Sequence, residues 1–321
     1  MSVRSAGAFY AARFLLGAAE AGFLPGIIFY LTRWFPARER ARTIAAFMSA
    51  TLVAGVVGGP LSGALLSLDG AGGLAGWQWL FLLEGLPAIV LGIVVLAMLP
   101  ETPADAPWLT PVERQVLEAA VREDVDAAAA TRPVVAAPFR DARVWRLAIV
   151  YFTIPVALYA IGFWLPQIVK TASRRGDFAV GVLTAIPYFV AAIGMVIAGR
   201  HSDRTGERRW HVAIAAVVGG AAFAASAGLR SVAPSLLVLS MAMLGLASMF
   251  GPFWTLATAV VGAPGAAVGI ALINSVGNIG GFVGPYVFGW IQDATHSFAS
   301  GLIFIGALLA LGGALVLTVR E

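Results

Sequence analysis

Long apolar segments alternate with short polar connections along almost the whole chain. A helix needs about 20 residues to cross the roughly 30 Å hydrocarbon core of a bilayer. Nine segments are long and apolar enough, at residues 9–32, 43–68, 77–99, 146–169, 179–199, 211–229, 234–261, 266–292 and 298–319. The pattern predicts an all-α integral membrane protein with about nine transmembrane helices. Their odd number predicts that the two ends of the chain lie on opposite sides of the membrane.

One polar segment, residues 100–145, is much longer than the other connections and separates the first three apolar segments from the last six. Within it, Thr110 is followed by a proline and, three residues on, by Glu113. A threonine N-cap with a glutamate at this spacing is a capping box, and proline is favoured in the first turn. We therefore predict a short surface helix up to about Asp126, followed by a flexible linker over residues 127–138.

Two glycine-rich stretches resemble each other at a long spacing. GVVGGPLSG contains Pro60, and GNIGGFVGPYVFG contains Pro285, 225 residues later. One span earlier in each case, Pro25 precedes Pro252 by 227 residues. The nearly equal offsets predict that the chain contains two similar halves.

The composition excludes an ordinary soluble domain. Of the 321 residues, 60% are hydrophobic and only 12% are charged, and the mean hydropathy is +0.87. The formal net charge of +4 does not indicate nucleic-acid binding, because the arginines lie between apolar segments rather than on one face. The chain has no cysteine, which excludes disulfides, cysteine-ligated metals and thiol nucleophiles.

The basic residues divide unevenly between the two sides of the membrane that alternating spans define. One side has Arg33, Arg38, Arg40, Arg42, Arg114, Arg122, Arg132, Arg140, Arg143, Arg146, Arg200, Arg204, Arg208, Arg209 and Arg320. The other side has Arg4, Lys170, Arg174, Arg175 and Arg230. Cytoplasmic loops carry the excess of Lys and Arg, so we predict a cytoplasmic C-terminus and an external Met1. The bias toward Arg, Ala and Gly indicates a bacterial genome, and hence the bacterial inner membrane.

The connection GRHSDRTGERR, residues 199–209, fits the pattern G-x-x-x-D-R-x-G-x-R-R. It resembles the cytoplasmic loop signature of the major facilitator superfamily. Gly199 and Gly206 would permit a tight turn, and Asp203 at a helix end could pair with an arginine from a neighbouring helix and latch one conformational state. With them the signature assigns Arg204 and Arg208 to the latch. The alternative is a positive-inside loop with a chance aspartate.

Further stretches are similar to the anion:cation symporter branch of that superfamily. They read RFLLGAAEAGFLPGIIFYLTRWFPARERAR, GWQWLFLLEGLPA, FWLPQIVK, SDRTGERRWH and GIALINSVGNIGGFVGP, and the resemblance runs essentially from end to end. It implies the major facilitator fold, with this chain matching helices four to twelve of twelve. Residues 1–99 would be the remainder of the N-terminal helical half, 100–145 the cytoplasmic linker, and 146–321 the six-helix C-terminal half.

Three helices of the family pattern have no counterpart in this chain. A mis-assigned start codon, a gene fragment and a true short form all remain open. The resemblance implies that proton coupling also involves charged groups on the first helix, which is among the three. We therefore expect these 321 residues not to transport by themselves.

Arg13 and Glu20 lie inside the first apolar segment, seven residues apart. On a helix they share a face, separated by about 10 Å along the axis. A charge at mid-bilayer costs at least about 2.5 kcal/mol, so such side chains usually face a cavity or a partner. The alternative is a static salt bridge, or snorkelling toward the interface. The resemblance implies a functional pair, in which Arg13 attracts an anion and Glu20 exchanges the driving proton.

Polar and aromatic side chains in the C-terminal half are further candidates for substrate binding. Asn274 and Asn278 lie one turn apart in an apolar span, where they either join helices or line a pathway. Tyr159 and Gln167 in the fourth span, and Trp254 beside a proline in the seventh, could give amphipathic contacts to a carboxylated or aromatic ligand. For Trp254 the alternative is a place in an interfacial aromatic belt.

Motifs of soluble enzymes are absent from the sequence, and its three histidines all fall at span ends, which argues against a buried metal site. We predict a secondary transporter without a cofactor, which takes up a small organic anion, such as a carboxylate, sugar acid or aromatic acid, together with protons by alternating access. Its partners would be this anion, protons and the lipid bilayer, with no nucleic acid. A drug/proton antiporter and a non-transporting membrane receptor or scaffold are the alternatives.

Overall fold

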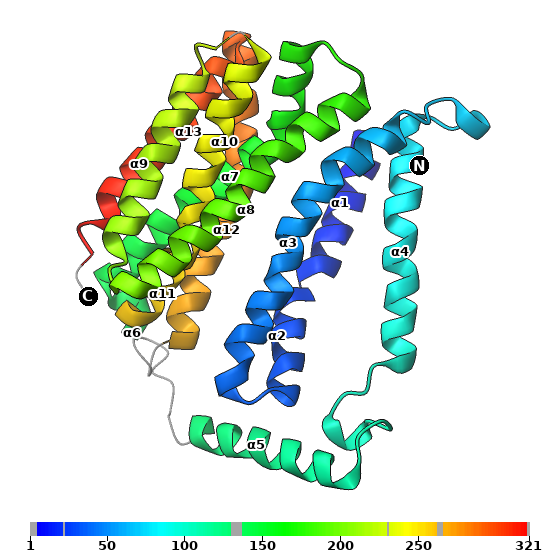
Figure 1. The fold of residues 1–321 in the computed structure, drawn as a ribbon, viewed down its shortest axis with the longest axis vertical. Coiled ribbons are helices and arrows are strands. Elements are labelled where there is room, and N and C mark those ends of the chain that lie inside the picture. Colours follow the sequence, from blue (N-terminus) through cyan, green and yellow to red (C-terminus); the bar gives the residue numbers. More distant parts are fainter. Residues whose placement is uncertain (1–4, 22, 130–136, 230, 262–265, 320–321) are drawn as a thin grey trace. The chain divides into compact units, whose positions relative to one another are not determined.

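The computed structural model describes residues 5–21, 23–129, 137–229, 231–261 and 266–319, and these residues form helices and connections without a strand. The helices are α1 (Ala6–Ala21), α2 (Phe23–Trp34), α3 (Ala37–Leu66), α4 (Gly76–Met98), α5 (Pro111–Ala129), α6 (Ala137–Arg140), α7 (Ala142–Ser173), α8 (Asp177–Thr205), α9 (Arg209–Ser226), α10 (Val232–Ser248), α11 (Phe250–Val261), α12 (Ala266–Thr295) and α13 (Phe298–Val316). Short 3₁₀ turns lie at Ala71–Gly73 and Pro103–Asp105. The predicted all-α class is confirmed (Figure 1).

Seven helical stretches among the described residues are long and apolar enough to cross a membrane. They are α4, α7, α8, α9, α10 together with α11, most of α12, and α13. The predicted span 9–32 is divided between α1 and α2, on either side of residue 22, and α3 has a shorter apolar stretch, Val53–Leu66. A multi-pass membrane protein is therefore confirmed, while the number nine stays a prediction.

The chain forms two compact units. Unit 1 comprises Met1–Thr51 and Leu68–Arg132, and unit 2 comprises Leu52–Ser67 and Pro133–Glu321. In unit 2 the main helix pairs are α12 with α7, α13 with α9, and α10 with α8 (Figure 1). Its core contains fully buried side chains from each of these pairs, including Ile154, Phe223, Leu239, Ile273 and Leu309.

Glycines allow close approach of helices at these pairs. A Cβ added to Gly220 of α9 would lie 2.5 Å from the backbone oxygen of Gly306 in α13. On α12, a Cβ at Gly280 would lie 2.5 Å from the carbonyl oxygen of Phe152 in α7. Lipid tails are as apolar as the helices, so helix association in a membrane depends on such tight packing rather than on hydrophobicity.

The C-terminal part of α3 belongs to unit 2 because it packs directly on α8. Gly59 lies against Gly181 so closely that a Cβ on either residue would meet the other's backbone. One turn later, a Cβ on Gly63 would lie 2.6 Å from the backbone oxygen of Asp177. The glycine-rich stretch of α3 recognised in the sequence therefore forms a helix crossing.

In unit 1, α2 and the polar segment are joined by aromatic and polar contacts. The rings of Trp34 and Trp108 stack 6.1 Å apart, and the Tyr30 hydroxyl donates to the carbonyl of Pro100 at 3.2 Å. The Arg33 guanidinium lies 3.7 Å from the Glu101 carboxylate. These contacts fix the start of the polar segment against the end of α2.

The predicted capping box at the start of α5 is confirmed. The backbone amide of Thr110 donates to Glu113 Oε2 at 2.9 Å, and the amide of Glu113 donates to Thr110 Oγ1 at 3.3 Å. The bonds that Thr110 donates lower the pKa of the Glu113 carboxyl. The helix continues to Ala129, three residues past the predicted end, and residues 130–136 of the predicted linker lie outside the described residues.

Candidate functional site

Arg13 and Glu20 both lie on α1, within unit 1. The guanidinium carbon of Arg13 is 5.3 Å from the centre of the Phe9 ring, four residues earlier, which is a cation–π contact. Within the chain the side chains of Arg13 and Glu20 are exposed. Both charges are therefore presented outward from unit 1 and are not buried in its interior.

An aromatic cluster joins α7 and α11 in unit 2. The Tyr151 ring stacks on Phe253 with centres 5.2 Å apart and meets Trp254 edge-on at 4.7 Å. A Cβ at Gly277 of α12 would overlap the Tyr151 ring. Trp254 thus packs within the bundle through Tyr151, a residue that the sequence reasoning missed, although it lies on the same helix as Tyr159 and two turns before it.

The two asparagines lie on α12 beside this cluster. Asn274 precedes Gly277 by three residues and is half-buried, and Asn278 follows it and is exposed. One turn on, a Cβ at Gly281 would lie 3.0 Å from the Tyr159 ring of α7, whose side chain is 47% exposed. Trp254 and Tyr159 thus contact the α7–α12 region through Tyr151 and Gly281, and Asn274 and Asn278 lie on the same stretch of α12. Amide, phenol and indole groups of this kind can donate hydrogen bonds to a carboxylate.

Gln167 lies apart from this group, at a cavity of about 480 Å³ between α3, α7 and α8 of unit 2. The cavity is also lined by Lys170, whose Nζ lies 2.7 Å from Oδ1 of Asp177, and by Thr184 and Tyr188. Sequence reasoning missed these four residues as candidates. In the sequence, Lys170 counts only among the basic residues that define the sides of the membrane.

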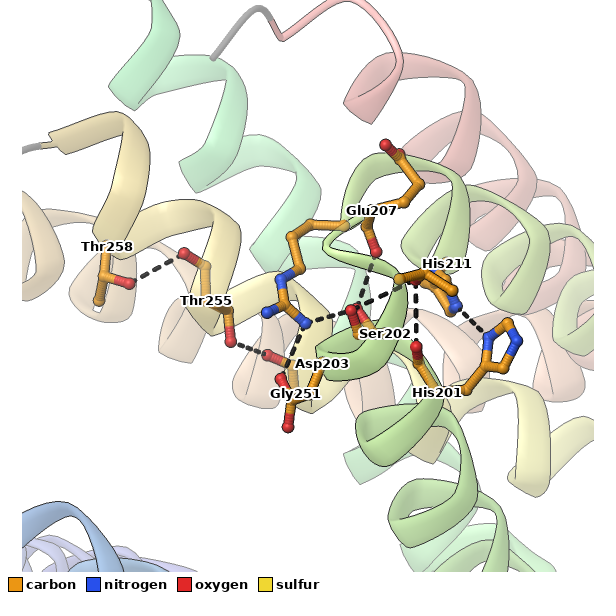
Figure 2. Close-up of polar contacts among 10 residues, drawn as sticks. His201, Ser202, Asp203, Glu207, His211, Gly251, Thr255 and Thr258 are labelled. Atoms are coloured by element: carbon orange, nitrogen blue, oxygen red, sulfur yellow. Dashed lines mark hydrogen bonds and ion pairs between the residues drawn. The ribbon is translucent and has the colours of Figure 1, made fainter.

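The turn between α8 and α9 is closed by a small polar network (Figure 2). The Arg208 guanidinium donates to Ser202 Oγ and to Asp203 Oδ1, both at 2.8 Å, and Ser202 Oγ donates to the carbonyl of Glu207 at 2.9 Å. Gly206 has φ +71°, the left-handed conformation that glycine adopts most readily. Among the described residues Asp203 therefore pairs with Arg208 of its own turn, five residues on, and not with an arginine from a neighbouring helix as expected.

Two residues of the signature, Gly199 and Arg204, lie outside this network. Gly199 does not form the turn: it lies inside α8, where a Cβ at Gly251 of α11 would come 3.7 Å from its Cα. Among the described residues Arg204 takes no part in the network and is exposed in the last turn of α8. The expectation of a turn at Gly199 was wrong because α8 continues for six residues after it.

Beside this network, His201 Nδ1 and His211 Nε2 lie 2.7 Å apart (Figure 2). One ring must donate and the other must accept for this bond to form. Within the described ranges, no three His, Cys, Asp or Glu side chains gather as they would around a metal ion.

The profile of the Major Facilitator Superfamily matches residues 1–285. The chain belongs to this superfamily. This major facilitator is 46% identical over 315 residues to the "Putative tartrate transporter" of Agrobacterium vitis, a match that covers 98% of the chain and 70% of the relative. It is 37% identical over 313 residues to the "Quinolone resistance transporter" of Acinetobacter baumannii, covering 97% of the chain and 71% of the relative.

The fold of this major facilitator is similar to that of a solved bacterial homologue of the human lysosomal transporter Spinster. The TM-score is 0.70 at 19% identity, and the match covers 99% of the chain and 80% of that structure. The superfamily and these relatives are transporters, which confirms the prediction of a membrane transporter rather than an enzyme.

Proposed function

We propose that this chain functions in the uptake of a small organic anion by secondary transport, with tartrate or a similar hydroxycarboxylate as substrate, by alternating access. The proposal is carried by the 46% identity to a protein named for tartrate, and the contacts of Tyr159 with Gly281 and of Trp254 with Tyr151 support it, since they lie on the stretch of unit 2 that also has Asn274 and Asn278. Neutral hydrogen-bond donors beside an aromatic surface suit a polar carboxylate that must be released again.

In unit 1, Arg13 and Glu20 are the charged residues of the proposal. The guanidinium of Arg13 attracts the anion, since it is always protonated and can bind a carboxylate in a bidentate manner. Glu20, two turns away on α1, takes up and releases the driving proton. Both side chains are exposed within the chain, so neither charge is buried among the described residues.

The network of Asp203, Gly206 and Arg208 would latch one conformational state at the cytoplasmic end of the bundle. The Arg208 side chain is only 17% exposed and bridges the end of α8 to the start of α9. Its bonds to Ser202 and Asp203 hold the two helix ends at one spacing. The excess of arginine on this side supports a cytoplasmic C-terminus in the bacterial inner membrane.

Equilibrium binding to the 321-residue chain in lipid nanodiscs tests this function. We expect saturable binding of radiolabelled tartrate, weakened about tenfold by Arg13→Gln, which removes a charged hydrogen-bond partner. Glu20→Gln should make the binding independent of pH while the wild type responds to it. Arg175→Gln, a matched loss of charge at an exposed connection, should bind as the wild type does. Absence of saturable binding would overturn the proposal.

Net uptake is a separate question, and the same chain in liposomes with an imposed proton gradient addresses it. The sequence prediction is that these 321 residues do not transport by themselves, and proton-driven accumulation of tartrate would contradict that prediction.

Drug efflux is the second candidate, because the chain is 37% identical to a protein named for quinolone resistance. A fluoroquinolone should then compete with tartrate for the nanodisc sites, or bind where tartrate does not. Competition by malate and none by a fluoroquinolone would favour the anion transporter. Binding of tartrate by a complete transporter without flux would favour a receptor.

A further inference from the structure

The cavity between α3, α7 and α8 has the dimensions of a binding site for a small acid. Its volume of about 480 Å³ falls within the range of roughly 300 to 1,000 Å³ that small-molecule sites occupy. The wall formed by α3 consists mostly of small residues, among them Gly55, Gly58, Gly59 and Gly63. Polar groups therefore come mainly from the other two walls, α7 and α8.

Of the described residues that line the cavity, only Lys170 and Asp177 carry a charge. They form an ion pair of 2.7 Å, in which the ammonium side chain is 60% exposed and the carboxylate side chain 37%. Such an exposed pair is weak, because water screens both charges. Its weakness means that another carboxylate can replace Asp177 at little cost.

Neutral polar groups on α7 and α8 line the same cavity as the pair. Gln167 lies one turn before Lys170 on α7, a spacing that brings both side chains to one face. On α8 the Thr184 hydroxyl already donates to the carbonyl of Val180 at 2.7 Å, so its free lone pairs can only accept. This combination of one cation, an amide and hydroxyl acceptors matches a carboxylate that also carries hydroxyl groups.

We propose that Lys170 is a second anion-binding residue, at which a carboxylate of a small hydroxy acid displaces Asp177. In the structure Asp177 pairs with the ammonium group of Lys170 at the cavity that α3 also lines. When the acid enters, its carboxylate takes the place of Asp177 on Lys170, and its hydroxyl groups donate to the acceptors of α8. This assignment rests on the proposed function, since it takes the substrate to be an anion.

Chemical labelling offers a direct test because Lys170 is the only lysine of the chain. Acylation of its amine in nanodiscs, followed by mass spectrometry of the peptide, should slow about fivefold when tartrate saturates the site, as expected for an exposed ion pair. Threitol, the uncharged polyol of the same carbon skeleton, should not protect. In Arg175→Lys the added amine lies outside the cavity lining and should react equally fast with and without tartrate.

Opposite effects of two substitutions separate carboxylate exchange from a merely structural ion pair. We expect Lys170→Gln to raise the tartrate Kd about fivefold, Lys170→Arg to restore it, and Asp177→Asn to lower it, because the competing carboxylate is gone. If the ion pair were merely structural, Lys170→Gln and Asp177→Asn would weaken tartrate binding equally. Tartrate binding without protection of Lys170 overturns this assignment alone, whereas no tartrate binding and no protection overturns it together with the proposed function.

Discussion

Asp141 begins α7 with two kinds of bond. Its Oδ1 accepts the backbone amide of Arg143 at 2.8 Å, and its Oδ2 pairs with the Arg143 guanidinium at 2.9 Å. The hydrogen bond from the Arg143 side chain is the main cause that lowers the pKa of the Asp141 carboxyl below its ordinary value. A carboxyl whose pKa is lower in the folded state stabilises the fold above its unfolded pKa, about 3.9, and loses that contribution as the pH falls through the lowered value.

Asp141→Ala should therefore destabilise the chain by about 1 kcal/mol at neutral pH, because α7 loses its N-cap. Asp141→Asn keeps a side-chain acceptor for the amide of Arg143 and should cost less. Thermal unfolding of the purified variants in detergent measures both. The wild type should be more stable than Asp141→Asn at neutral pH, and this difference in stability should vanish in acid. A difference that persisted in acid would contradict the role of the carboxylate.

A glycine at a close helix crossing has a different effect on stability from a glycine with open space around it. Gly306 of α13 meets Gly220 of α9 backbone to backbone, and its added Cβ would overlap the Gly220 carbonyl oxygen. Gly92 of α4 has nothing within 4 Å of an added Cβ within the described residues. Glycine is therefore needed for packing at Gly306, whereas at Gly92 it only makes the helix less stable than another residue would.

Gly306→Ala should destabilise unit 2 by about 1 to 3 kcal/mol, as overpacking does, because a backbone atom cannot move aside as a side-chain end can. Gly92→Ala is the matched control and should be neutral or stabilising by up to about 1 kcal/mol from helix propensity. Unfolding in detergent compares the two. Equal effects would show that α9 and α13 do not cross at these glycines.

The orientation of the whole chain in the membrane follows from its arginines. The connection between α7 and α8 should be external and the polar segment with α5 cytoplasmic. Because the chain has no cysteine, single cysteines report on each side without background. Arg175 and Arg122 are exposed positions on these two segments.

An impermeant maleimide should label Arg175→Cys in intact cells and Arg122→Cys only after permeabilisation. The cysteine-free parent chain is the control. The reverse pattern would invert the proposed topology and place the α8–α9 network outside the cytoplasm.

Much of the architecture could be predicted from local sequence. Apolar length predicts most of the spans, the Thr110–Glu113 spacing predicts the start of α5, and Gly206 predicts the turn after α8, because each depends on residues that are neighbours in the chain. Gly199 was misplaced because the signature records spacing and not the residue at which a helix ends.

No local sequence pattern indicates which segments far apart in the chain are in contact. Nothing near Trp254 in the sequence indicates that Tyr151 is its partner, and nothing near Lys170 indicates the glycine wall of α3. The sequence by itself determined the membrane class, the helical segments, the loop signature and the residues able to carry charge, since hydropathy and turn chemistry act over a few residues. Only the tertiary structure decided which helix faces meet, because packing depends on shape across long separations in the chain, and it is this packing that placed Lys170 and Asp177 at a cavity.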